Sequence, residues 1–121
     1  MTPLESRDKA VAAAKAAMAK KAKDTLILEL KGLTVIADYF VICSGESTTQ
    51  VNAIAENVMS EFLKEAMRPL SIEGKGHAHW VLIDYGDVII HVFEEETRSY
   101  YELEKLWLDA PRIAAPEEQG R

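Results

Sequence analysis

The residues best placed to do chemistry in this chain surround a short serine and glycine segment. Ser44, Gly45 and Ser47 follow an apolar run and precede a helical pattern, as the residues of a phosphate-binding loop do. Nucleotidyl transfer also needs paired carboxylates that hold two magnesium ions, and no Asp-x-Asp pair follows this loop. A simpler interpretation is that Ser44 ends a strand and Ser47 caps a helix. The alternative hypothesis is a minimal magnesium-dependent nucleotidyltransferase that uses Ser44 and Ser47 with the acids Asp84 and Asp87.

Histidine and cysteine are the other candidate ligands and nucleophiles. His77 and His79 alternate in sequence and His91 follows, but their spacing does not build a four-ligand site, so we expect no metal. The single cysteine, Cys43, cannot form an intramolecular disulfide. Its apolar neighbours would raise its pKa and leave the thiol inert, which favours a reducing compartment.

Composition limits the classes of partner. The chain of 121 residues is 48% apolar and 28% charged, as folded globular proteins are. Twenty acidic residues outnumber 14 basic ones, and no basic cluster follows a phosphate backbone, so we expect no direct nucleic-acid readout. A net charge of −6 favours a basic protein partner instead. No apolar stretch approaches the roughly 20 residues that span a bilayer, which predicts a cytoplasmic protein without membrane contact.

The hydrophobic pattern predicts one domain over residues 1–110 and a disordered tail over 111–121. Its fold class is α/β (α+β), with a single mixed sheet of about five strands flanked by helices. We expect helices over 4–22, 47–66 and near 100–107, and strands over 25–30, 39–43, 70–72, 80–85 and 88–93.

The last two strands form a predicted hairpin with Tyr85 and Gly86 as its two-residue turn. This register places Asp84 opposite Asp87, Leu82 opposite Ile89 and Trp80 opposite His91. One face of the hairpin is then an unbroken β-branched surface that suits a core beneath helices. Its members are Val81, Ile83, Val88, Ile90 and Val92.

The opposite face mixes aromatic, aliphatic and acidic groups, and it is not an ordinary solvent face. It carries Trp80, Leu82, Asp84, Asp87, Ile89, His91 and Phe93. Two carboxylates placed directly across a hairpin repel each other, and a cationic partner would relieve that repulsion. A tryptophan beside exposed aliphatic and acidic groups is typical of a protein interface. The alternative is that a helix covers Trp80 and Leu82.

Three segments resemble motifs of one known family. Residues 38–47 (Asp-Tyr-Phe-Val-Ile-Cys-Ser-Gly-Glu-Ser) are similar to the signature of the ribosomal silencing factor family, also called Iojap-like. Glu73-Gly74 followed by residues 80–93 (Trp-Val-Leu-Ile-Asp-Tyr-Gly-Asp-Val-Ile-Ile-His-Val-Phe) resembles its central hairpin. Arg98 and residues 100–107 (Tyr-Tyr-Glu-Leu-Glu-Lys-Leu-Trp) resemble its closing motif. The resemblance covers about residues 22–110, most of the chain.

The resemblance implies a nucleotidyltransferase-like fold in a factor that is not an enzyme and needs no cofactor. Such a factor binds the large ribosomal subunit through ribosomal protein fourteen, sterically blocks subunit association and represses translation under nutrient limitation. It is a homodimer when free. The partner surface implied for this chain has Trp80 as its apolar anchor and Asp84 and Asp87 facing Lys or Arg side chains. Its other residues are Leu82, Ile89 and His91, with Arg98, Tyr101 and Glu104 from the closing motif.

Overall fold

A computed structural model describes residues 5–115 of the chain as one mixed α/β unit. The fold class predicted from the sequence is confirmed. Two longer helices, α1 (Ser6–Met18) and α2 (Thr48–Leu63), are followed late in the chain by α3 (Glu95–Tyr101) and a 3-10 helix, η1 (Leu103–Trp107). The strands are β1 (Lys23–Glu29), β2 (Tyr39–Gly45), β3 (Ser71–Glu73), β4 (Trp80–Asp84), β5 (Val88–Glu94) and β6 (Arg112–Ile113).

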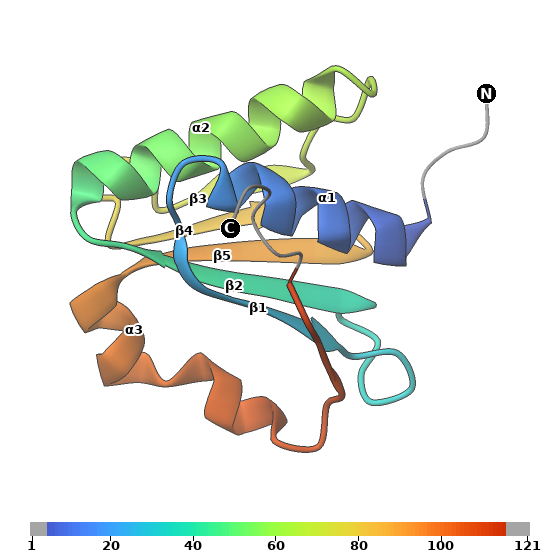
Figure 1. Cartoon of the computed structure of the whole chain (residues 1–121). Coiled ribbons are helices and arrows are strands. Elements are labelled where there is room, and N and C mark those ends of the chain that lie inside the picture. Colours follow the sequence, from blue (N-terminus) through green and yellow to red (C-terminus); the bar gives the residue numbers. More distant parts are fainter. Residues whose placement is uncertain (1–4, 116–121) are drawn as a thin grey trace.

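The strands form one sheet in the order β3-β4-β5-β2-β1-β6. The central pair, β2 and β5, is parallel, and every other neighbouring pair is antiparallel. Figure 1 shows α1 and α2 on one face of the sheet and α3 with the segment after it on the other. The molecule is therefore three layers deep, and the two faces of the sheet meet different neighbours.

The helical face holds the larger core. The five β-branched residues of the predicted hairpin face are all buried here, as expected, beneath the apolar side of α2. Ser47 begins α2 as an N-cap, because its side chain accepts a hydrogen bond from the Gln50 amide at 3.1 Å. Helix α1 packs through the small side chains of Ala10, Ala13 and Ala17. All seven residues of β2 are buried, as a central strand covered on both faces requires.

The hairpin of β4 and β5 has a register that differs from the predicted one by two residues. Trp80 lies opposite Phe93, Leu82 opposite His91, and Asp84 opposite Ile89. The Tyr85 amide donates to the Val88 carbonyl at 2.9 Å, so Gly86 and Asp87 are the central turn residues. The prediction that Asp84 faces Asp87 was therefore wrong. Because the shift is an even number of residues, the side chains of β4 and β5 keep their predicted faces, whereas Asp87 lies in the turn and pairs with Lys9 of α1.

The C-terminal region also differs from expectation. A disordered tail from residue 111 was predicted, but Arg112 and Ile113 form β6, which pairs with Leu28 and Ile27 of β1 and makes a sixth strand. Residues 116–121 lie outside the described part of the chain. The single late helix that was predicted is divided in two, because Glu102 adopts a left-handed backbone (φ 49°) between α3 and η1.

Candidate functional site

The sheet face opposite α1 and α2 carries a second, smaller core. Its buried members include Leu28, Phe40, Ile42 and Phe93, and the partly buried side chains of Leu103 and Trp107 on η1 pack against them. Two predicted contact residues belong to this core, since Ile89 is 7% exposed and His91 is 4% exposed. The C-terminal segment thus covers the β1 and β2 side of this face. Toward the β4 edge, Trp80 and Leu82 remain half-buried.

Trp80 is held by three aromatic neighbours. Its ring stacks on Phe93, the residue directly opposite in the register, with a centroid distance of 4.7 Å and an interplanar angle of 30°. Tyr101 of α3 approaches to 5.1 Å between centroids. The indole Nε1 donates a hydrogen bond to Nδ1 of His91 at 3.1 Å. The tryptophan is therefore fixed in place while part of its ring reaches the surface, as an interface anchor requires.

The two aspartates of the predicted surface have different roles in the fold. Asp84 is half-buried on the Trp80 side, and its Oδ1 accepts a hydrogen bond from the Gly86 amide at 2.7 Å. Asp87 lies in the turn and forms a salt bridge with Lys9 of α1 at 3.0 Å. The two carboxylates are not paired across the strands, so the expected repulsion between them is absent.

One acidic residue on this face was missed from the sequence. Glu73 lies opposite Leu82 in the β3–β4 pair, so its side chain shares the face of Leu82 and Trp80, and it is exposed. The sequence pattern had assigned it to the loop before Gly74. The signal that could have located it is Gly74 itself, because glycine readily adopts the positive φ that ends β3 at Glu73, one residue later than predicted. We refer to Glu73, Trp80, Leu82, Asp84 and Tyr101 as the Trp80 surface.

Of the three closing-motif residues that were predicted to contact a partner, one lies on the surface and two have structural roles. Tyr101 is 55% exposed beside Trp80. Arg98, whose side chain is 12% exposed, donates from Nε to Glu104 at 3.2 Å and from Nη1 to the Asp24 carbonyl and the Ser44 hydroxyl, each at 2.8 Å. These bonds tie α3 and η1 to the ends of β1 and β2. Arg98 and Glu104 thus hold the C-terminal layer on the sheet.

Ser44 and Ser47, the serines of the predicted loop, have structural roles. The Ser44 hydroxyl is buried and accepts the bond from Arg98, and Ser47 caps α2. Within residues 5–115, no group of three or more His, Cys, Asp or Glu side chains is placed to hold a metal ion. His79 pairs with Glu94 at 2.7 Å. Burial raises the pKa of the Cys43 thiol to about 12, which leaves it protonated and unreactive at neutral pH.

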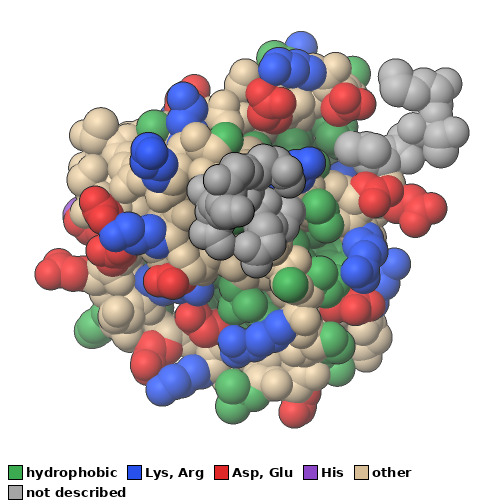
Figure 2. Space-filling model, in the orientation of Figure 1, with side chains coloured by type: hydrophobic (Ala, Val, Ile, Leu, Met, Phe, Trp, Pro, Cys, Tyr) green, Lys and Arg blue, Asp and Glu red, His purple; other side chains and the backbone are tan. Residues whose placement is uncertain are grey.

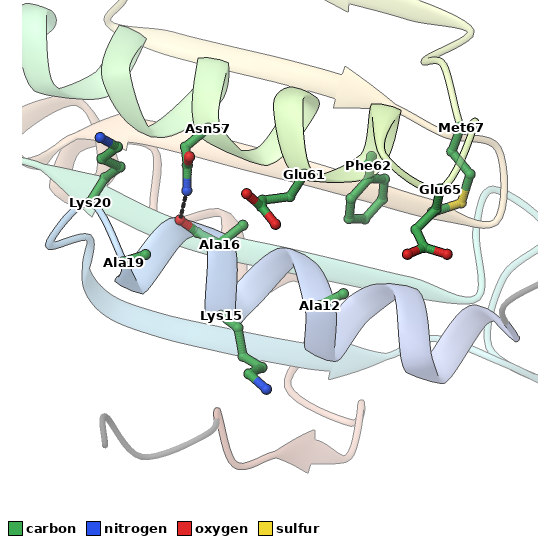
Figure 3. A pocket seen from close by; sticks show the side chains of 10 residues that line it. All are labelled: Ala12, Lys15, Ala16, Ala19, Lys20, Asn57, Glu61, Phe62, Glu65 and Met67. Carbon is green, nitrogen blue, oxygen red and sulfur yellow. Dashed lines mark hydrogen bonds between the residues drawn. The ribbon is translucent and has the colours of Figure 1, made fainter. Parts of the chain in front are cut away.

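A groove lies away from the Trp80 surface, between α1 and α2 (Figure 3). It has a volume of about 650 Å³, and Phe62 and Glu61 point into it from α2. Asn57 closes one side by donating to the Ala16 carbonyl at 2.8 Å. Alanine methyl groups of α1 form much of the opposite wall. The lining also includes the charged side chains of Lys15, Lys20 and Glu65, so apolar and charged groups are mixed along the groove.

The face of the molecule drawn in Figure 2 is mixed in charge. Figure 2 shows acidic and basic side chains interspersed on the face it presents, without a continuous basic stripe. Of the helices in residues 5–115, none combines the length and the apolar character that crossing a bilayer demands. The partly exposed aromatic and acidic Trp80 surface is thus the feature that most resembles a binding site.

Comparison with known proteins decides the family. The model of the family described as "Ribosomal silencing factor during starvation" matches residues 3–121. The chain belongs to the ribosomal silencing factor family. A ribosomal silencing factor of Bacillus subtilis is 48% identical over 92 residues, which cover 76% of this chain and 78% of that protein. A mouse protein named "Mitochondrial assembly of ribosomal large subunit protein 1" is 38% identical over 91 residues, or 73% of this chain and 40% of its own length.

Solved structures agree with the family assignment. A crystal structure from Bacillus halodurans is 39% identical, has a TM-score of 0.79, and is matched over 89% of this chain and 98% of that one. A crystal structure from Chromobacterium violaceum is 28% identical, with a TM-score of 0.84 and 98% of each chain covered. The chain therefore shares the mixed fold of these two structures.

Proposed function

We propose that this silencing factor docks through the Trp80 surface onto a protein of the large ribosomal subunit and sterically prevents the small subunit from joining. The observation that carries the proposal is the state of Trp80, which is fixed by Phe93, His91 and Tyr101 yet remains partly exposed. A preorganised aromatic anchor loses little conformational entropy on binding. The names of the relatives support a ribosomal role, since one relates to silencing and another to assembly of the large subunit.

The chemistry beside the anchor favours a basic partner. Glu73 is exposed next to Leu82, and Asp84 is half-exposed on the same face. Such carboxylates form charge-assisted hydrogen bonds with Lys or Arg, and the net charge of −6 steers the chain toward a basic protein. Ribosomal protein fourteen is the partner that we propose. Asp87 would reach this partner only after it had released Lys9.

The proposed action is one of binding rather than turnover. The factor occupies the surface that the small subunit needs, which represses translation when nutrients are limiting. It works in the cytoplasm, without a cofactor, membrane contact or direct readout of nucleic acid. We also propose a homodimer in the free state. If the dimer uses the Trp80 surface, dimerisation and subunit binding compete by mass action.

Co-sedimentation with purified large ribosomal subunits tests the proposal. Wild-type protein is expected to pellet with large subunits and not with small ones, and Trp80→Ala is expected to lose at least about tenfold in affinity, as hot-spot aromatics do. Leu63→Ala is the matched control, because Leu63 is an exposed apolar residue on α2, across the sheet. A wild-type protein that stays in the supernatant, or a folded Trp80→Ala variant that binds equally well, would refute the proposal.

A further inference from the structure

The imidazole of His91 lies directly beneath the Trp80 surface. It occupies the middle of β5, opposite Leu82, and is almost completely buried. Its Nδ1 accepts the indole N–H of Trp80 at 3.1 Å. Its Nε2 is buried without a hydrogen-bond partner among the described residues, and the ring of Phe40 packs against it with centroids 4.5 Å apart. A polar ring in this position needs an explanation, because an apolar ring of similar size would fill the same space.

The hydrogen bond specifies the protonation state of the ring. Nδ1 can accept from Trp80 only if it carries a lone pair, so the imidazole is neutral and its proton lies on Nε2. A protonated ring would instead present N–H groups on both nitrogens, and its Nδ1–H would oppose the indole N–H. The contact between His91 and Trp80 therefore exists only with the neutral histidine.

The aromatic contacts of Trp80 do not by themselves determine which edge of the indole points outward. Stacking on Phe93 and contact with Tyr101 limit the plane of the ring, but these contacts are only weakly directional. Rotation about χ2 by a half turn would keep the ring in roughly the same plane while exchanging its edges. The hydrogen bond to His91 selects the orientation in which Nε1 points toward the buried imidazole.

We propose that His91 is a positioning residue of the docking surface, and that its neutral Nδ1 holds the indole of Trp80 in the orientation that meets the partner. The inference rests on the proposed function, since it assigns a role within the same surface. His91 itself does not touch the partner. It acts through Trp80, so its effect on binding must vanish once the indole N–H has been removed.

The surroundings of His91 keep the ring neutral. Burial lowers its pKa to about 4. Three carboxylates on the elements packed around it are engaged elsewhere: Asp84 with the Gly86 amide, Glu94 with His79, and Glu104 with Arg98. Tyr39 and Cys43 of β2 belong to the core on the helical face. The other titratable or charged groups on these elements are Glu95, Glu96, Tyr100 and Tyr101 of α3 and Lys105 of η1.

A double-mutant cycle on binding to purified large subunits tests the coupling. His91→Phe keeps an aromatic ring against Phe40 but removes the acceptor. We expect it to weaken binding about fivefold, the effect of one lost hydrogen bond. In a Trp80→Phe background, which has no indole N–H, the same change should alter affinity less than twofold. An equal loss in both backgrounds, or no loss in either, overturns the proposal.

A spectroscopic measurement on the free protein separates this inference from the docking proposal. The indole N–H resonance of Trp80, distinguished from that of Trp107 by a Trp107→Phe variant, is expected to shift upfield in His91→Phe, because its hydrogen bond is lost. If that resonance does not move, the positioning role is refuted. If it moves but wild-type protein does not bind large subunits, the docking function is wrong and the His91 contact still orients Trp80.

Discussion

Gly74 and Trp80 approach so closely that a side chain at position 74 would collide with the strand. A Cβ atom built on Gly74 would overlap the carbonyl oxygen of Trp80 and lie 3.1 Å from its carbonyl carbon. The backbone of Gly74 also has φ +84°, and its carbonyl accepts from the Ala78 amide at 2.8 Å. This turn returns the chain from β3 to β4, and Trp80 begins β4 immediately after it.

Gly74→Ala is therefore expected to destabilise the fold and displace the anchor. We expect a loss of about 2 kcal/mol or more in the free energy of unfolding, because a left-handed backbone and a backbone clash act together. Urea unfolding and the fluorescence of Trp80 would measure both effects. Gly76→Ala is the control, since nothing lies within 4 Å of a Cβ built there, and it should stay within about 0.5 kcal/mol of wild type. Equal losses in the two variants would contradict the prediction.

Stability should fall as the pH is lowered, because of His91. Its pKa is about 4 in the fold, against an ordinary value of 6.5, so between these values the unfolded chain binds more protons than the folded one. The contribution of the neutral ring is thus fully present above pH 6.5 and is lost as the pH falls toward 4, by up to about 3 kcal/mol. Urea unfolding of wild type and His91→Phe at several pH values isolates this effect. Parallel stability curves would show that His91 does not contribute it.

Arg98 should contribute more than its exposed neighbours do to the stability with which α3 and η1 pack on the sheet. Arg98→Lys keeps the charge but cannot bridge Glu104, Ser44 and the Asp24 carbonyl together, so we expect a loss of about 2 kcal/mol. Hydrogen exchange of the η1 amides should also accelerate. Lys105→Ala removes only an exposed ion pair and should change the free energy of unfolding by less than about 1 kcal/mol. Unchanged protection of η1 in Arg98→Lys would argue against this role.

The salt bridge between Lys9 and Asp87 is expected to serve the fold. A double-mutant cycle with Lys9→Ala and Asp87→Ala should give a coupling of about 0.5 to 1 kcal/mol, since both side chains are only partly exposed. Lys9→Ala should leave binding to large subunits unchanged, because the bridge lies in the turn and not on the Trp80 surface. Tighter binding by Lys9→Ala would instead show that releasing Asp87 supplies a contact to the partner.

The faces of the strands were predictable from the sequence, but the hairpin register was not. Alternation along 80–84 and 88–94 places Val81 and Trp80 on opposite faces whichever turn is used. The register depends on whether Gly86 is the first or the second central turn residue, and glycine is accepted at both positions. The sequence therefore located Trp80 and Leu82 on the correct face, yet placed them opposite the wrong residues.

Periodicity did not predict that α3 and η1 pack on the sheet face that carries Trp80. Tyr100, Leu103 and Trp107 follow a helical spacing, which does not reveal on which sheet face this segment packs or that Glu102 breaks the helix. Burial of His91 depends on this packing, as does the structural role of Arg98. Glu73 was missed because β3 contains only three residues, too few for an alternating pattern to be recognised.

The parallel pairing of β2 with β5 also has a consequence for the synthesis of the protein. Residues 39–45 find this partner strand only at residues 88–94, so the centre of the sheet cannot close while the nascent chain ends before that point. Until then β2 has one unpaired edge, and the apolar residues of α2 lack the strand β5 that they pack against. Such long-range pairing slows folding and exposes intermediates to aggregation. A factor proposed to act on ribosomes would thus complete the central strand pair of its own sheet only after about three quarters of its chain had left the ribosome that makes it.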